Sequence, residues 1–172
     1  MLPEMLVLVD QADQVIGVEE KMKVHREGLL HRAFSIMIFN NQGQLLIQKR
    51  SAIKYHSAGL WANSCCGHPR LHEDNLAAAQ RRLREELGFT CPLVKITTVS
   101  YALKLANGLY EHEYTHLFTG VYTAGLDLNP DEVAEIKWIM PVDLQQEATL
   151  NPEPYAAWFR LYLTTCYAKI FA

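Results

Sequence analysis

Residues 72–89, HEDNLAAAQRRLREELGF, form the one strong helical crossover in a chain whose other regular patterns are mostly strands. Asp74 or Asn75 can accept hydrogen bonds at the start of this helix, and Gly88 can adopt the left-handed conformation that ends it. Its apolar residues make one stripe, which consists of Leu76, Ala79, Leu83 and Leu87. A chain of this kind favours clustered strands with helices on either side of the sheet.

Apolar runs separated by short polar turns predict strand hairpins before and after this helix. The predicted strand pairs lie at 7–18, 33–50 and 93–122, and a further strand is predicted at 132–140. Because the strands cluster and only one strong crossover joins them, we expect an α+β fold, an α/β/α sandwich with a mixed sheet.

The remaining patterns are helical or irregular. A short helix is predicted from Pro141 to Leu144, and another covers 151–172. One side of this last helix is expected to carry Trp158, Leu161 and Thr165. Residues 51–70 have no regular pattern and predict a long loop, and long loops inside compact domains are usually functional.

Length and charge limit the kind of protein this can be. With 172 residues the chain can bury a full core, and we expect one domain, 1–172. A formal net charge of −3 argues against partners such as nucleic acid or a membrane surface, so an anionic ligand needs locally placed basic residues. The chain has neither an apolar run of the roughly 20 residues that span a membrane nor a signal-peptide pattern.

The stretch WANSCCGHPRL, residues 61–71, places two adjacent cysteines before a Gly-His-Pro turn. They could be structural thiols, metal ligands or a reactive site. A structural zinc site would need a C-x2-C pair, which this sequence lacks. Four cysteines, two of them neighbours, suit free thiols in a reducing cytoplasm better than a disulfide framework. Cys91 and Cys166 are interpreted as small buried hydrophobic residues.

Histidines and acidic residues could together bind a metal. Glu111 and Glu113 are two apart on a predicted strand, so both face the same side, with His112 on the other. The imidazoles of His25, His31 and His68 could join these two carboxylates. Such a mixed nitrogen and oxygen site would suit Mn²⁺ or Zn²⁺ and would bind Ca²⁺ poorly. Any single histidine is most simply a surface or core residue, and we interpret His56, His72 and His116 in that way.

From Gly67 the sequence reads G-x5-E-x7-R-R-L-R-E-E-L-G-F. This pattern resembles the Nudix box, a loop–helix–loop that holds Mg²⁺ and a diphosphate, and the resemblance implies a Nudix-like sandwich. One position departs from it. Arg82 stands where the box has a glutamate that, in the hydrolases, helps hold the metals that activate water. A cation at this position suits a diphosphate that is bound and kept intact.

Further motifs resemble one branch of that superfamily, the type I isopentenyl diphosphate isomerases. The matching stretches are GVEEKMKVHREGLLHRAFS, WANSCCGHP and YEHEYTH, together with a tryptophan near the C-terminal end. They agree with the isomerases in order and spacing from about Gly17 to Trp158, which is most of the chain.

The resemblance implies a role for each matching residue. The catalytic positions fall on Cys66, Glu113, Tyr101 and Trp158. The positions that contact the diphosphate fall on Lys21, Arg50, Lys54 and Arg82. The ligands of one metal fall on His25, His31, His68, Glu111 and Glu113, and those of a Mg²⁺ on the diphosphate fall on Glu86 and the Cys66 carbonyl. Cys65 is expected to pack beneath the loop.

The implied reaction moves the double bond of isopentenyl diphosphate by one carbon to give dimethylallyl diphosphate. Cys66 and Glu113 would transfer protons on opposite faces of the five-carbon unit, in an order that the sequence leaves open. The implied cofactors are Mg²⁺ and a second divalent metal, Mn²⁺ or Zn²⁺, in a cytoplasmic monomer whose partner is the small diphosphate. One alternative is a Nudix hydrolase of a nucleoside or sugar diphosphate, which Arg82 and Cys66 argue against. Another is a metal-dependent binding module without catalysis.

Overall fold

The computed structural model describes residues 3–171, and its strands form one mixed sheet. The strands are β1 (Met5–Val9), β2 (Val15–Glu20), β3 (His31–Phe39), β4 (Leu45–Arg50), β5 (Trp61–Ala62), β6 (Cys65–Gly67), β7 (Val94–Lys104), β8 (Tyr110–Val121) and β9 (Val133–Ile139). The helices are α1 (Lys21–Glu27), α2 (Asn75–Leu87), α3 (Pro141–Leu150), α4 (Ala157–Leu163) and α5 (Tyr167–Phe171). β3 runs parallel to β8, whereas the other strand pairs are antiparallel. The predicted α+β class with a mixed sheet is confirmed.

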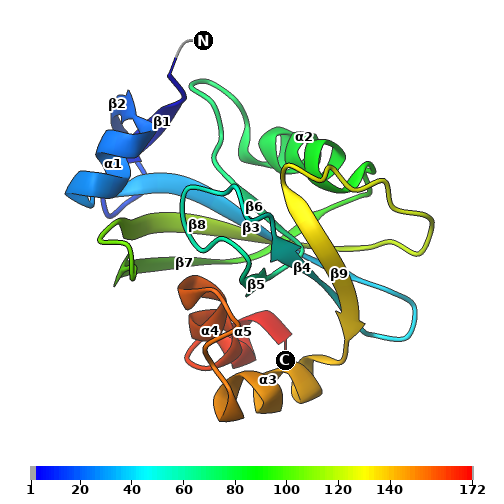
Figure 1. Cartoon of the computed structure of the whole chain (residues 1–172). Coiled ribbons are helices and arrows are strands. Elements are labelled where there is room, and N and C mark those ends of the chain that lie inside the picture. Colours follow the sequence, from blue (N-terminus) through cyan, green and yellow to red (C-terminus); the bar gives the residue numbers. More distant parts are fainter. Residues whose placement is uncertain (1–2, 172) are drawn as a thin grey trace.

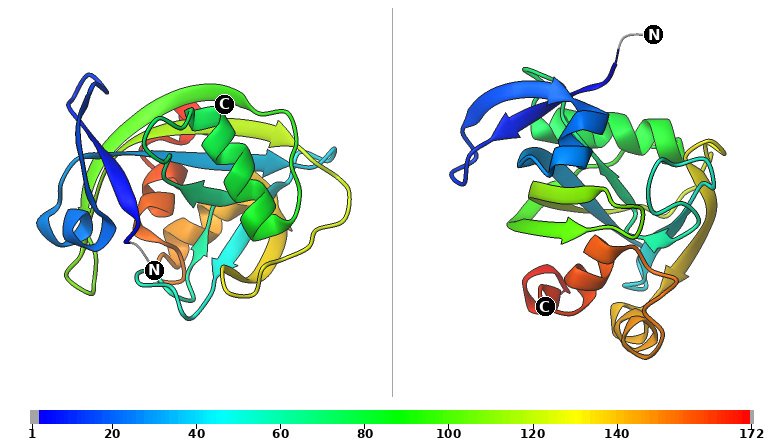
Figure 2. Two further views of the ribbon diagram at one scale, coloured as in Figure 1. Left: turned by 90° about the horizontal axis from the view of Figure 1, so that it is seen from above. Right: turned by 60° about the vertical axis from the view of Figure 1, so that its left-hand side comes forward.

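The sheet lies between two layers of helices. Figure 1 shows α2 on one face and α3, α4 and α5 on the other, while α1 lies at one end beside the β1–β2 hairpin. Figure 2 shows the same two layers from other directions. β3 is buried along most of its length because both faces of the sheet are covered there, which explains its almost continuous apolar sequence.

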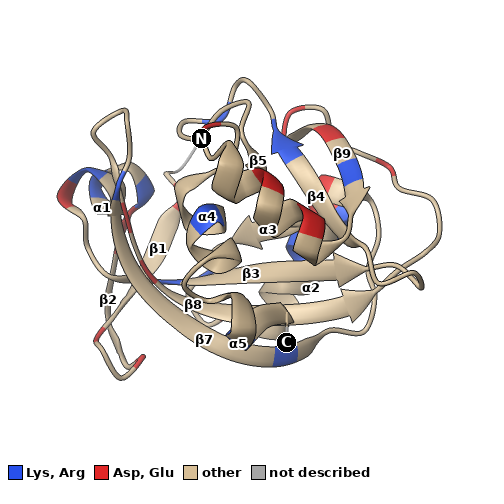
Figure 3. Ribbon diagram, turned by 90° about the horizontal axis from the view of Figure 1, so that it is seen from below, with Lys and Arg blue, Asp and Glu red and all other residues tan. Residues whose placement is uncertain are grey.

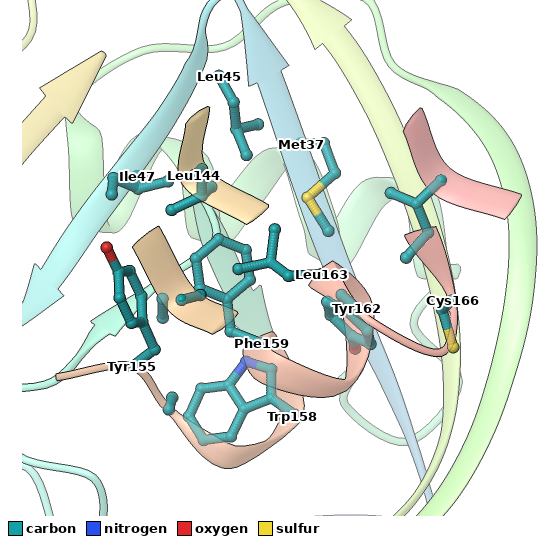
Figure 4. Close-up of a cluster of buried hydrophobic side chains, with 14 of the residues drawn as sticks. Met37, Leu45, Ile47, Leu144, Tyr155, Trp158, Phe159, Tyr162, Leu163 and Cys166 are labelled. Carbon is teal, nitrogen blue, oxygen red and sulfur yellow. The ribbon is translucent and has the colours of Figure 1, made fainter. Parts of the chain in front are cut away.

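Each layer of helices closes its own hydrophobic core. Along β3, Phe34, Ile36 and Ile38 pack in the core beneath α2, while Met37 packs in the core on the opposite face. This division follows from the alternation of side chains along a strand. Figure 4 shows the second core, in which Phe159, Tyr162 and Leu163 of the C-terminal segment lie against Met37 and the strand residues Leu45 and Ile47.

Helix α2 begins and ends where the sequence predicts. The carboxylate of Asp74 accepts hydrogen bonds from the backbone N–H groups of Leu76 and Ala77, and Gly88 ends the helix with a φ of 77°. The predicted stripe is partly wrong, since Leu76 is exposed and Ala78 is buried in its place. Leu76 lies in the first turn, next to the cap, before the helix makes close contact with the sheet.

The C-terminal helices differ from the prediction. α3 continues six residues beyond the predicted end to Leu150, and residues 151–172 do not form one helix. Prolines at 152 and 154 delay the start of α4, and the chain leaves helical geometry at Thr164, where two β-branched residues follow one another. Thr165 is therefore exposed, and Ala172 of the predicted helix lies outside the described residues.

The predicted loop 51–70 contains the two short strands β5 and β6. β6 pairs with β3 where β3 and β4 separate from each other. β3 and β4 pair directly only at Phe39 and Leu45, because β6 then pairs with β3, Cys66 opposite Ser35. The hydroxyl of Ser64 accepts the Ile38 backbone N–H at 2.8 Å and donates to the Leu46 carbonyl at 2.6 Å. This side chain satisfies the backbone where the two strands separate.

Gly88→Ala is expected to destabilise the fold by about 2–4 kcal/mol, because it adds steric overlap to the cost of a left-handed alanine. A Cβ at Gly88 would lie 2.6 Å from the backbone oxygen of Asp127. The matched control is Gly108→Ala, whose φ is 82° but whose Cβ would meet nothing within 4 Å, so about 1 kcal/mol is expected there. Urea unfolding measures both, and equal losses would refute the steric argument.

Candidate active site

A cavity of about 340 Å³ opens where the 51–70 loop crosses the sheet beside the start of α2. Most residues that the sequence predicts for the site line it: Lys21, Arg50, Lys54, Cys66, His68, Arg82, Tyr101, Glu111, Glu113 and Trp158. His25, His31 and Glu86 are buried just outside this lining. The fold therefore gathers these residues from segments that are far apart in the sequence.

Three histidines and two carboxylates meet at one side of the cavity, where His68, Glu111 and Glu113 line it. The parallel register of β3 and β8 sets His31 opposite Glu113, with 3.6 Å between His31 Nε2 and Glu113 Oε1. His68 Nε2 lies 3.3 Å from the same oxygen, and His25 Nε2 lies 3.7 Å from Glu111 Oε1. Glu111 and Glu113 face the same side of β8, as predicted from their spacing.

The short helix α1 holds His25 in this group. Its start is capped by the carboxylate of Glu20, which accepts from the backbone N–H groups of Met22 and Lys23. It ends at Gly28, whose φ is 66°. Both ends of the helix are thus fixed by local hydrogen bonds, so His25 has a defined position although the helix is only seven residues long.

The histidines are oriented as metal ligands usually are. Nδ1 of His25 lies 2.7 Å from the Lys21 carbonyl oxygen, and Nδ1 of His31 lies 2.9 Å from that of Leu29. A carbonyl oxygen can only accept, so each Nδ1 carries the proton and each Nε2 keeps its lone pair, which in His25 faces the Tyr55 hydroxyl at 3.3 Å. His31 Nε2 and Glu111 Oε2 are buried without a hydrogen-bond partner in the described chain. These residues therefore fit a divalent metal of the Mn²⁺ or Zn²⁺ type.

Burial and neighbouring charges move the pKa values of these groups in different directions. Burial lowers the pKa of His25 and lowers that of His68 to about 4, so both imidazoles are neutral near pH 7. Burial also opposes ionisation of Glu113, but the imidazoles of His31 and His68 outweigh it and hold the pKa of Glu113 well below its usual value. Burial and the nearby charge of Glu113 raise the pKa of Glu111.

Glu113 and Cys66, two groups that can give or take a proton, both line the cavity. The hydroxyl of Tyr101 donates to Glu113 Oε2 at 2.6 Å. The thiol of Cys66 donates to Asn63 Oδ1 at 3.1 Å and lies 3.3 Å from the hydroxyl of Ser35. Burial raises the pKa of Cys66 to about 12, so this thiol keeps its proton at neutral pH and can act as an acid.

Comparison with known proteins assigns the family. The NUDIX domain model matches residues 29–160. The chain is 50% identical over 159 residues to isopentenyl-diphosphate Delta-isomerase 2 of Photorhabdus laumondii, covering 92% of this chain and 90% of that protein. It is 49% identical to the isopentenyl-diphosphate Delta-isomerase of Serratia proteamaculans, covering 92% of this chain and 88% of that protein. The chain belongs to the NUDIX family. Within that family it groups with the isopentenyl-diphosphate Delta-isomerases.

A solved structure shows the same fold. The crystal structure of DR0079 from Deinococcus radiodurans superposes with a TM-score of 0.81 over 95% of this chain and 99% of that one, at 22% identity. At that level of identity the match shows a shared fold.

Three of the four predicted basic residues that line the cavity, Lys21, Lys54 and Arg82, form ion pairs. Lys21 Nζ lies 2.8 Å from a Glu4 carboxylate oxygen, and Lys54 pairs with Glu132. Arg82, the residue that departs from the Nudix box, bonds Glu85 Oε2 at 2.6 Å and Glu86 Oε1 at 2.5 Å and lies 3.2 Å from Glu132. Glu86 also accepts from Gln48 at 2.8 Å, so Arg82 and Gln48 surround a carboxylate that the sequence suggests as a Mg²⁺ ligand.

Two residues of this site were not predicted from the sequence. Asn63 accepts hydrogen bonds from both the Cys66 thiol and the Trp158 indole N–H, the latter at 3.2 Å, and so fixes one residue against the other. His56 was interpreted as an ordinary residue, but its Nε2 lies 2.7 Å from Glu111 Oε1. Both residues lie in the 51–70 segment. The sequence predicted a functional loop there, and that prediction was the one signal that pointed to them. Cys65 is buried in the core beneath α2, as expected.

Proposed function

We propose that this chain converts isopentenyl diphosphate into dimethylallyl diphosphate. The observation that carries the proposal is one cavity that places a protonated thiol, Cys66, together with an ionised carboxylate, Glu113, in a chain half identical to named isomerases. Moving a double bond by one carbon requires one group that gives a proton and one that takes a proton. Cys66 and Glu113 supply these two roles.

The proton transfers balance without change to the diphosphate. One group protonates the terminal carbon of the double bond, which leaves a tertiary carbocation, and the other removes a proton from the carbon on the far side. Tyr101, bonded to Glu113, can relay the proton held at that carboxylate. The Trp158 ring lines the cavity and can stabilise the cation through its π-face. The hydrogen bonds that Asn63 accepts from Trp158 and Cys66 fix the positions of these two residues relative to each other.

Four basic residues would bind the diphosphate: Lys21, Arg50, Lys54 and Arg82. They line the cavity and are already paired with carboxylates or with the Trp158 ring, so substrate phosphate would replace or share those contacts. Arg82 in particular supplies a guanidinium where a hydrolase would hold metals for water activation. Binding without hydrolysis is the expected outcome.

Two divalent metals are part of the proposal. His25, His31, His68, Glu111 and Glu113 would hold one, Mn²⁺ or Zn²⁺, and Glu86 with the Cys66 carbonyl would hold Mg²⁺ on the diphosphate. The bound metal would set the acidity of Glu113 and neutralise charge on the substrate. The supporting observations are the unpartnered His31 Nε2 and Glu111 Oε2 and the backbone bonds to His25 and His31.

The direct test incubates the purified protein with isopentenyl diphosphate and Mg²⁺ and follows both products by NMR. Equilibration with dimethylallyl diphosphate, without release of inorganic phosphate or diphosphate, is expected. Phosphate release without isomerisation would instead identify a hydrolase, and binding without turnover would identify a non-enzymatic module.

His25→Ala and His68→Ala are each expected to weaken Zn²⁺ binding by at least about tenfold, because each removes a ligand that the fold has already oriented. Zn²⁺ affinity is measured by competition with a chromophoric chelator, and circular dichroism checks the fold. The control is His72→Ala, since His72 is exposed and outside the cavity. Retention of full Zn²⁺ affinity by both variants would contradict the assignment of the metal ligands.

We further propose a cytoplasmic monomer, formed by the single domain 1–172, whose partner is the small diphosphate. No helix within residues 3–171 is long and apolar enough to cross a membrane. On the α3–α5 side, Figure 3 shows acidic positions along α3 and basic positions on α4 and α5, so neither sign dominates that face. Mixed charge of this kind supports a compact ligand in the cavity over an extended polyanion.

A further inference from the structure

Glu132 lies between two of the basic residues that would bind the diphosphate. It directly precedes β9 and lines the cavity together with Lys54 and Arg82. One of its carboxylate oxygens, Oε2, pairs with Lys54 Nζ, and the other, Oε1, lies 3.2 Å from a guanidinium nitrogen of Arg82. The two oxygens of one carboxylate therefore contact cations from two separate elements, the 51–70 segment and α2.

The backbone around Glu132 fixes the position of this carboxylate. The Glu132 carbonyl accepts a hydrogen bond from the Ser51 N–H at 3.0 Å, which joins it to the segment that carries Lys54. The Glu132 N–H donates to the Asn129 carbonyl at 3.0 Å, and the Asn129 N–H donates to the Glu86 carbonyl of α2 at 3.0 Å. Glu132 is thus tied by its backbone to both elements whose cations its side chain contacts.

Partial burial makes these ion pairs stronger than ordinary surface pairs. The side chains of Lys54, Arg82 and Glu132 are 18%, 20% and 21% exposed, so water and salt screen their charges only in part. Burial opposes ionisation of Glu132, but Lys54 and Arg82 outweigh it and hold the pKa of Glu132 below its usual value. The carboxylate is therefore charged at neutral pH.

The carboxylate of Glu132 and a phosphate group would bind the same donors. Both are anions that accept charge-assisted hydrogen bonds from lysine and arginine, so each weakens the binding of the other at a shared cation. Arg82 also pairs with two carboxylates of its own helix, Glu85 and Glu86. Lys54 has no second carboxylate within ion-pair distance among the described residues. The competition therefore affects Lys54 most.

We infer that Glu132 is a specificity-determining residue of the cavity: its carboxylate competes with anionic ligands for Lys54 and Arg82. This inference rests on the diphosphate site of the proposed function. The competition weakens the binding of every anion that uses these two cations. A diphosphate has a second phosphate group for Lys21 and Arg50, so it binds in spite of Glu132, whereas inorganic phosphate has fewer contacts and binds poorly at the same concentration.

Glu132→Gln tests the competition, because the amide has nearly the same shape as the carboxylate but carries no charge. Isothermal titration calorimetry measures the affinity of the purified protein for inorganic diphosphate and, separately, for inorganic phosphate, in buffer without added divalent metal. Both affinities are expected to rise by about tenfold in the variant, because a like charge beside the bound anion is removed.

Glu135→Gln is the matched control. It makes the same change three residues further along the chain, within β9, at an exposed carboxylate that does not line the cavity. Its diphosphate affinity is expected to change by less than about twofold, since solvent screens that charge. Circular dichroism checks the fold of both variants. In a Lys54→Met background, Glu132→Gln should raise the affinity by less than about threefold, because one of the two contested cations is gone.

Unchanged or weaker diphosphate binding in Glu132→Gln would overturn the inference, and so would a tenfold gain that persists in the Lys54→Met background. A wild type that binds inorganic diphosphate but does not isomerise isopentenyl diphosphate would instead overturn the proposed function. The two failures are therefore distinguishable, because one is read from the affinity of a variant and the other from the turnover of the wild type.

Discussion

Cys66→Ala is expected to lower the turnover number by at least about 100-fold, because it removes one of the two groups that exchange protons with the substrate. Affinity for the diphosphate should change little, since the basic residues that line the cavity are untouched. In heavy water, the wild type should place deuterium at both the methyl-forming carbon and the carbon that loses its proton, and Cys66→Ala should lose one of the two. Turnover and label position are both read by NMR.

Cys65→Ala is the matched control, because it makes the same chemical change at the adjacent residue. The Cys65 side chain is fully buried in the core beneath α2 and does not reach the cavity, so turnover should be nearly unchanged. Its expected effect is a loss of about 1 kcal/mol in the free energy of unfolding, from a small cavity. Near-normal turnover in Cys66→Ala, or inactivation by Cys65→Ala, would refute the assignment.

Glu113→Gln is expected to reduce turnover by at least about 100-fold and also to weaken metal binding, because an amide of the same size can neither take a proton nor neutralise a cation. The amide oxygen can still accept the Tyr101 hydroxyl, so the fold should survive. Turnover, Zn²⁺ affinity and circular dichroism are measured on the same samples.

The control for this change is Glu135→Gln, which neutralises an exposed carboxylate on β9 whose nearest cation, Lys49, is 3.9 Å away. It should leave both turnover and metal affinity unchanged. A Glu113→Gln protein that lost metal but kept turnover would separate the two roles and contradict the proton-transfer assignment.

Local patterns predicted the long helix and strands because residues close together in the sequence determine where these elements end and which faces they bury. α2 has a side-chain cap at Asp74 and a left-handed stop at Gly88, and the β7–β8 hairpin has alternating faces. β5 and β6 have only two and three residues, and their pairing depends on β3 and β4, which are distant in the sequence. No local pattern carries that information, so the segment was predicted as a loop.

The residues of the site also divide into those that local spacing predicts and those that only the tertiary structure brings together. Glu111 and Glu113 could be placed on one face of a strand from their spacing alone. The family resemblance suggested the three histidines, which the fold then gathered around those carboxylates. His56 could not be recognised, because a lone histidine in an irregular segment has no periodicity and its partner, Glu111, is supplied only by the tertiary structure.

The residues that meet in and beside the cavity are far apart along the chain, and this separation has a kinetic consequence. His68 and Glu113 are 45 residues apart, Asn63 and Trp158 are 95 apart, and Ser35 and Tyr162 are 127 apart. Contacts of such long range close large loops, and chains that depend on them fold slowly. A fragment or an early folding intermediate would lack a complete set of metal ligands. A metal that binds only the completed site should therefore slow global unfolding, and stripping it with a chelator should shorten the lifetime of the native state.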